Sequence, residues 1–82
     1  MPPGFFGTGI SLLSYADALI GLGRYRDAEA PMREGHDIVL ALTDPHDRGV
    51  QHATRALVDI YERTGRPAEA AKWRAKVDPQ GE

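Results

Sequence analysis

Apolar residues recur at three- and four-residue steps along most of the chain, a spacing typical of amphipathic α-helices. The first segment with this spacing covers residues 10–22, and its apolar side consists of Leu12, Leu13, Ala16, Leu19 and Ile20. Two further segments cover about residues 25–42 and 47–64, and a shorter one runs from Pro67 to Val77. The pattern therefore predicts four helices and no strand.

Glycine and proline mark the ends of these predicted helices. Gly23 and Gly65 follow the first and third segments, where a helix commonly ends in a residue with a left-handed backbone. Residues 43–49 contain Asp-Pro and Gly, which predicts a polar loop between two hairpins. Residues 1–9 hold two prolines and three glycines and predict an irregular leader, whereas residues 78–82 form a tail.

Pro31 interrupts the second predicted helix. Proline lacks the N–H that an interior helical residue donates, and its ring clashes with the preceding turn. We therefore expect either a kink near Asp27 or a helix that effectively begins later than residue 25.

One phrase occurs twice in the chain. Gly-Arg-Tyr-Arg-Asp-Ala at 23–28 returns 42 residues later as Gly-Arg-Pro-Ala-Glu-Ala at 65–70, each time after an apolar helical segment. Self-similarity at such a period indicates a repeat architecture, whose function lies on the surface that the stacked helices build. The predicted fold class is all-α, with helix-turn-helix hairpins at 10–43 and 47–77.

Length and composition exclude several classes of function. The 82 residues suffice for one domain. Ten Lys and Arg stand against twelve Asp and Glu, and the net charge of −2 offers no basic footprint for nucleic acid or an anionic membrane. There is no cysteine for a disulfide framework, and neither a transmembrane run nor a signal peptide. We expect a cytoplasmic protein without nucleic-acid or membrane partners.

The order of large, small and glycine positions resembles the tetratricopeptide repeat (TPR). The first unit matches the family's large, small, large, Gly, aromatic, small, large and small positions with Tyr15, Ala16, Leu19, Gly23, Tyr25, Ala28, Met32 and Gly35. The second unit matches at Leu57, Tyr61, Gly65 and Ala70; it departs from the pattern at Val58, Pro67 and Arg74, with Trp73 next to Arg74. The resemblance implies four antiparallel helices in a short right-handed α-solenoid that binds a protein or peptide.

Two narrower resemblances concern the period and the C-terminal part. The period of 42 residues exceeds the usual TPR length of about 34 and is similar to the longer subtype of kinesin light chains. Residues 55–77 also resemble the last repeat of bacterial serine/threonine kinases with TPR tails, but the chain has none of the kinase motifs. The main hypothesis is thus a protein-binding scaffold; the alternative is a kinase's regulatory tail without independent activity.

The TPR family binds peptides in a concave groove lined by the first helix of each repeat. The matching positions here are Leu13, Asp17, Ile20, His52, Arg55, Asp59 and Glu62. Charges of both signs on the third predicted helix suit either a peptide of mixed charge or a free carboxylate that binds Arg55, because guanidinium pairs with carboxylate bidentately. The alternative is a solvated helix face with intrahelical pairs such as Arg55–Asp59 and Asp59–Arg63. The carboxylate clamp of chaperone-binding members needs Lys and Asn, where this chain has Leu13 and Asp17.

Nothing in the sequence predicts catalysis, a cofactor or a metal site. Ser11 and Ser14 lack a Gly-x-Ser-x-Gly context, and the glycine-rich stretches neither follow a strand nor end in Gly-Lys-Ser/Thr. No two of His36, His46 and His52 have the i, i+4 spacing of metal ligands on one helix. We therefore expect a binding module and not an enzyme.

Two repeats are fewer than the three or so that a solenoid usually needs, because the end units leave an apolar face uncovered. We expect that face to be covered by self-association into a homo-oligomer, by Phe5 and Phe6 of the leader, or by repeats of a longer parent chain. The rings of Tyr25, Tyr61 and Trp73 are expected to pack in the core.

Overall fold

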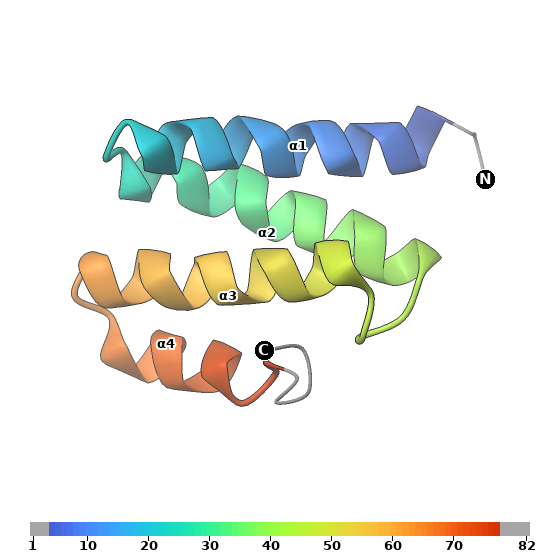
Figure 1. Cartoon of the computed structure of the whole chain (residues 1–82). Coiled ribbons are helices and arrows are strands. Elements are labelled where there is room, and N and C mark those ends of the chain that lie inside the picture. Colours follow the sequence, from blue (N-terminus) through green and yellow to red (C-terminus); the bar gives the residue numbers. More distant parts are fainter. Residues whose placement is uncertain (1–3, 78–82) are drawn as a thin grey trace.

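The computed structural model describes residues 4–77, and four helices account for most of them (Figure 1). These are α1 (Gly4–Gly21), α2 (Tyr25–Leu42), α3 (Arg48–Arg63) and α4 (Pro67–Arg74). Each helix runs antiparallel to the one before it, and no strand occurs among the described residues. The prediction of an all-α chain with four helices is confirmed.

The first helix begins earlier than its sequence suggests. Residues 4–9 belong to α1 and are not an irregular leader, so that prediction is wrong for them. The reason lies in packing, because a Cβ atom on Gly9 would come within 2.7 Å of Ile38 Cγ2 on α2. This glycine permits a close helix approach and does not break the helix. The predicted cover by Phe5 and Phe6 concerns side chains outside the described ones.

The two repeated glycines end α1 and α3 in the same way. Gly23 and Gly65 have φ angles of +77° and +73°. In the first turn, Arg24 N donates to Leu19 O at 2.8 Å and Gly23 N to Ile20 O at 2.9 Å. The second turn repeats both bonds 42 residues later, Arg66 N to Tyr61 O at 2.8 Å and Gly65 N to Glu62 O at 3.3 Å. Both are Schellman motifs, which confirms the predicted glycine turns.

The other helix boundaries agree with the sequence in α2 and α3 and differ in α4. Helix α2 begins at Tyr25 and continues through Pro31, so the expectation of a later start is wrong. Asp47 caps α3, since its Oδ2 accepts from Gly49 N at 2.8 Å. Helix α4 ends at Arg74, before the predicted Val77, because the backbone tightens into i to i+3 hydrogen bonds, such as Val77 N to Arg74 O at 3.1 Å.

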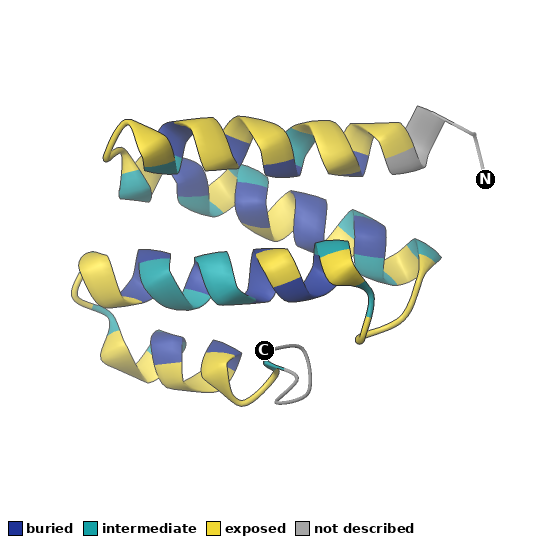
Figure 2. Cartoon of the chain, viewed as in Figure 1, coloured by how far each residue is buried: buried dark blue, intermediate teal, exposed yellow. Residues whose placement is uncertain are grey.

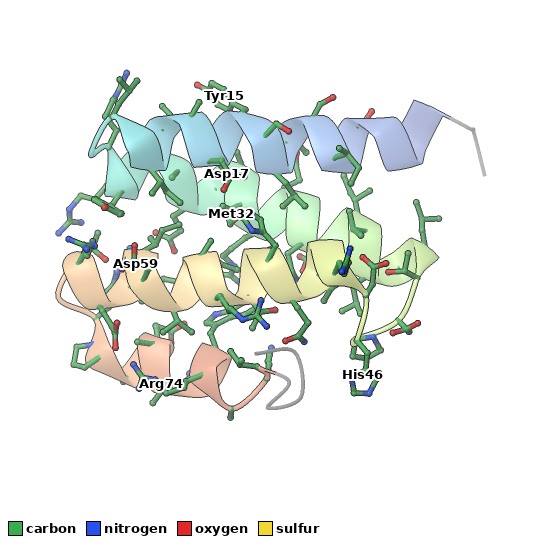
Figure 3. The ribbon with its side chains drawn as sticks, in the orientation of Figure 1. Tyr15, Asp17, Met32, His46, Asp59 and Arg74 are labelled. Carbon is green, nitrogen blue, oxygen red and sulfur yellow. The ribbon has the colours of Figure 1, made fainter. Side chains whose placement is uncertain are left out.

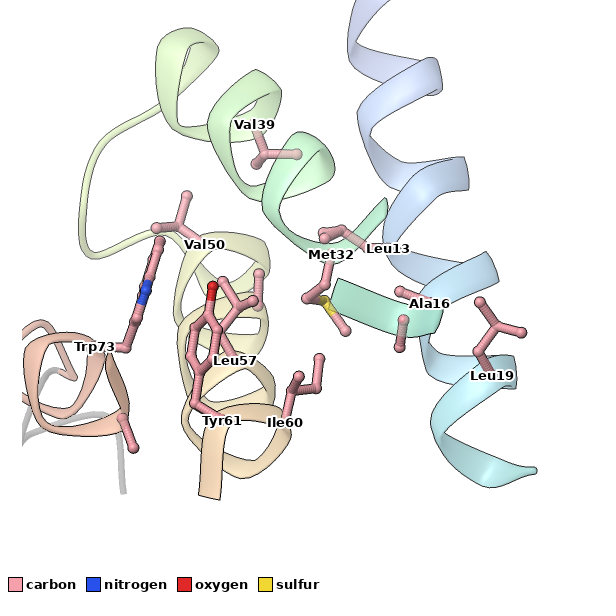
Figure 4. Packing of buried hydrophobic residues seen from close by; sticks show 13 residues of the cluster. Leu13, Ala16, Leu19, Met32, Val39, Val50, Leu57, Ile60, Tyr61 and Trp73 are labelled. Carbon is pink, nitrogen blue, oxygen red and sulfur yellow. The ribbon is translucent and has the colours of Figure 1, made fainter. Parts of the chain in front are cut away.

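The core lies between successive helices, and α2 and α3 are buried on more sides than α1 and α4 (Figure 2). Met32 of α2 lies between the side chains of α1 and those of α3 (Figure 4). The buried hydrophobic residues are Leu13, Ala16, Leu19, Ala28, Met32, Val39, Val50, Ala53, Leu57, Ile60, Tyr61, Ala70 and Trp73. The predicted placement of Tyr61 and Trp73 in the core is confirmed, and Tyr25 packs against it partly buried.

Candidate peptide-binding face

The predicted groove positions of α1 and α3 meet at one polar contact. His52 Nε2 lies 2.8 Å from both carboxylate oxygens of Asp17, although the two residues are 35 positions apart. Asp17 projects from the side of α1 that faces α3 (Figure 3). Both side chains are about half exposed. The first helices of the two hairpins therefore share a solvent-exposed face, on which Asp17 and His52 bind each other.

The other two α1 candidates do not belong to an open groove. Leu13 is buried in the core with 5% exposure, so its prediction as a groove residue is wrong. It fits there because Gly35 of α2 and Gly49 at the start of α3 leave room for its branched end. Ile20 is partly buried and packs against the same core. Helix α1 thus contributes only Asp17 as a polar group of this face.

The acidic candidates on α3 already have basic partners. Asp59 Oδ1 accepts from Arg63 Nε at 3.0 Å, which confirms this predicted intrahelical pair. The Arg63 guanidinium also lies 5.0 Å above the Tyr25 ring. Hydrogen bonding by Asp59 raises the pKa of Arg63 further above its usual value. Glu62 pairs with Arg74 of α4. Both acidic candidates of α3 are thus paired with arginines of the same molecule.

Arg55 lies on the side of α3 that adjoins α4. It lines a hollow of about 250 Å³ together with Val58, Arg74 and Val77. Two guanidinium groups and two valines thus surround one small space, although Arg74 also pairs with Glu62. An arginine carries five N–H donors, so one carboxylate partner does not use all of them. The sequence analysis identified Arg55 but not the other three residues of this hollow. The signal that could have pointed to them is the charge of Arg74 at a TPR position that is usually apolar.

A polar network that the sequence did not predict joins the two hairpins. Glu29 of α2 accepts from Arg66 Nη2 at 2.7 Å and Nη1 at 3.2 Å, and from the Tyr61 hydroxyl at 2.9 Å. Arg66, the residue before α4, also stacks 4.7 Å above the Tyr61 ring. Arg33 approaches the Tyr61 oxygen at 3.4 Å. One carboxylate therefore links α2, α3 and the start of α4.

This network shifts the pKa values of its members. The hydrogen bond from Arg66 holds the pKa of Glu29 below 4.5, helped by the bond from Tyr61 and by the charges of Arg66 and Arg33, and opposed by partial burial. Burial, followed by the neighbouring Glu29, raises the pKa of Tyr61 above 10.0. The Glu29 bond also raises the pKa of Arg66. At neutral pH the network is therefore a carboxylate, a guanidinium and a neutral phenol.

Replacing Glu29 by glutamine is expected to remove a pH-dependent part of the stability. A folded pKa below the unfolded value means that the contribution is complete at neutral pH, decreases as the pH falls through 4.5, and vanishes below the folded pKa. We expect Glu29→Gln to lower the free energy of unfolding at pH 7 by about 1 kcal/mol, because solvent still reaches the pair. Urea unfolding followed by circular dichroism between pH 7 and about 3 measures the difference.

The matched control is Glu34→Gln on the exposed side of the same helix. This variant is expected to follow the wild type at every pH. A difference between wild type and Glu29→Gln that stayed constant down to the lowest pH would contradict the assignment to the Glu29 charge.

The three histidines lie in different environments. His36 is buried, with its Nδ1 3.0 Å from Asp37 Oδ1 and its ring edge-on to Trp73 at 4.9 Å. His52 binds Asp17, and His46 is exposed in the loop after α2. Among residues 4–77, no group of three or more His, Cys, Asp or Glu is placed to hold a metal ion.

Comparison of the chain with protein-family models, curated protein sequences and solved structures found no match. In the part of the chain that the structure describes, no helix is long and apolar enough to cross a membrane.

Proposed function

We propose that the chain is a TPR-like helical-repeat module, a non-catalytic cytoplasmic scaffold that binds a protein or peptide on the face shared by α1 and α3, at the edge of this face where α3 adjoins α4. The two hairpins end their first helices in the same Schellman turn, 42 residues apart. This equivalence supports a right-handed solenoid in which the first helices line one side. The polar groups on that side are the exposed Asp17, His52 and Glu62 and the partly buried Arg55 and Asp59.

The observation that carries the proposal is the hollow between Arg55 and Arg74. Paired guanidinium groups suit a carboxylate, and Val58 and Val77 suit a small apolar side chain next to it. The C-terminus of a peptide combines these two features. Asp59 pairs with Arg63, which does not line the hollow, whereas Glu62 pairs with Arg74 at its edge. Arg74 carries five N–H donors, more than this one carboxylate uses. The partner chemistry is therefore a C-terminal carboxylate after an apolar residue.

Binding to peptides with free C-termini tests this function. An array of random hexapeptides that end in valine is compared with the same array carrying C-terminal amides. We expect the chain to retain acid peptides preferentially. For the best peptide, fluorescence anisotropy should show about tenfold weaker binding to Arg55→Ala, the loss typical of one charge-assisted hydrogen bond.

Arg26→Ala is the control, because it removes one positive charge from an exposed position on α2. Its affinity is expected to equal that of the wild type. Equal retention of acids and amides, or no retention of either, would contradict the proposal.

A further inference from the structure

The outer face of α1 carries no charge and has no neighbour in the bundle. Asp17 is the only charged residue of this 18-residue helix, and it binds His52 on the side toward α3. Tyr15 is 59% exposed and Leu22, in the turn that follows, is 72% exposed. Tyr15 points away from the other helices (Figure 3). Exposed large apolar side chains on an uncharged face mark an interaction surface.

The internal repeat indicates what such a face does when it is covered. The face consists of Ser11, Tyr15, Ala18 and Leu22, and the same positions 42 residues later are Ala53, Leu57, Ile60 and Thr64. Ala53, Leu57 and Ile60 have 0% exposure in α3, where they lie in the core next to α2. The equivalent face of α1 lacks a helix in that place. A helix is therefore the kind of element that fits it.

The opposite end of the bundle does not offer a matching face. The positions equivalent to Glu29, Met32 and Arg33 of α2 are Ala71 and Arg74 of α4 and Ala75 just after it, and all three are exposed. Arg74 and Lys72 place charges on this short helix, paired with Glu62 and Glu69. Head-to-tail stacking of α1 onto α4 would bury these charges against an apolar surface, at a cost in desolvation. An uncharged face is better matched by another uncharged face.

We propose that a second copy of the chain covers this face, with α1 packed antiparallel against α1 of the other copy around a two-fold axis at Tyr15. This inference rests on the proposed function, since it assigns self-association of the repeat module to the α1 end of the helix stack. Residues 11, 15, 18 and 22 follow four-, three- and four-residue steps, the seam of a two-helix contact. In this register Leu22 of one copy lies opposite the small residues 7–9 of the other (Gly, Thr and Gly), so a large side chain meets small ones.

The size of the contact makes the dimer reversible. Helix α1 has 18 residues and is therefore about 27 Å long. One helix pair of this length buries less than the roughly 800 Å² per partner of a stable interface. We expect dissociation constants of about 0.01–1 mM.

Sedimentation equilibrium of the whole chain tests the proposal. The wild type is expected to dimerise with concentration, and Leu22→Glu and Tyr15→Glu to stay monomeric, because each places a charge in the seam. Both positions are exposed, so folding is preserved and is checked by circular dichroism. Ala71→Glu on the exposed side of α4 is the control and should dimerise like the wild type. A wild type that remains monomeric up to about 1 mM, or Glu variants that dimerise normally, would overturn the proposal.

Cysteine crosslinking tests the geometry, since the chain has no cysteine of its own. Two Tyr15→Cys copies lie at the axis and should form a disulfide on oxidation. Two Leu22→Cys copies are about 21 Å apart in the antiparallel arrangement and should not. Crosslinking at Leu22 in place of Tyr15 would overturn it. The monomeric Leu22→Glu variant is also tested for peptide binding. Because the hollow at Arg55 does not involve α1, this measurement tests the proposed peptide site independently of the proposed dimer.

Discussion

Replacing Trp73 by alanine is expected to release α4 from the bundle and to lower the free energy of unfolding by about 3–5 kcal/mol. Trp73 has 6% exposure, and Ala70 is the only other buried residue of this helix. Its ring packs against His36, and Lys76 lies 4.2 Å from the ring centre. Eight residues are too few for an isolated helix in water. Without the indole, little remains to hold α4 in place.

Urea unfolding measured by circular dichroism is the appropriate experiment, because Trp73 is the only tryptophan and its fluorescence is lost with the substitution. The native spectrum of Trp73→Ala is also expected to lose helical signal from α4. Lys72→Ala, at an exposed position one residue earlier, is the control and should change stability by less than about 0.5 kcal/mol. A Trp73→Ala chain as stable and as helical as the wild type would show that α4 is held by other contacts.

Local sequence signals predicted the turns and the two central helices correctly, because their causes are local. Gly23 and Gly65 are the residues that adopt a left-handed backbone at least cost, and each ends its helix through hydrogen bonds within six residues. The apolar periodicity likewise fixed α2 from Tyr25 to Leu42. The early end of α4 was missed, since a tightened last turn leaves no mark in the apolar pattern.

The candidate site was only partly predictable, because its residues depend on which neighbours the fold supplies. Leu13 and Arg55 occupy the same position in their repeats, yet Leu13 is buried and Arg55 lines a hollow. The repeat alignment cannot distinguish the two. Small residues around Leu13 and the charge of Arg74 near Arg55 make the difference, and both come from other helices. The network around Glu29 was missed for the same reason, since its members are 32 and 37 residues apart.

Glycine has two opposite roles in this chain: it ends helices at the turns and allows close packing inside them. Only the first role can be predicted from the sequence alone. Gly9 and Gly35 lie inside α1 and α2, and each leaves no room for a Cβ atom against the opposite helix. The sequence interpretation treated the glycines of residues 1–9 as helix breakers. A glycine that allows two helices to pack closely can be recognised only when the opposing helix is known. The position of Gly35 in the second helix does not show which helix packs against it.

Replacing Gly35 by valine is therefore expected to destabilise the fold by about 2–3 kcal/mol. A Cβ atom at this position would lie 2.9 Å from the carbonyl oxygen of Gly9 and 2.7 Å from Leu13 Cδ2. The leucine end can rotate, but the carbonyl belongs to the backbone of α1, so the two helices must move apart. This cost exceeds the gain from replacing glycine in a helix, which is up to about 1 kcal/mol. Urea unfolding gives the difference.

Gly7→Val is the matched control, because a Cβ atom on Gly7 would meet nothing within 4 Å. This variant changes glycine to valine in α1 and therefore reports the effect of helix propensity without the clash. We expect its free energy of unfolding to be within about 0.5 kcal/mol of the wild type. Gly35→Ala should fall between the control and Gly35→Val, since alanine introduces the clashing atom but gains the most propensity. If Gly35→Val and Gly7→Val were equally stable, the close approach of α1 and α2 at Gly9 and Gly35 would not be needed for the fold.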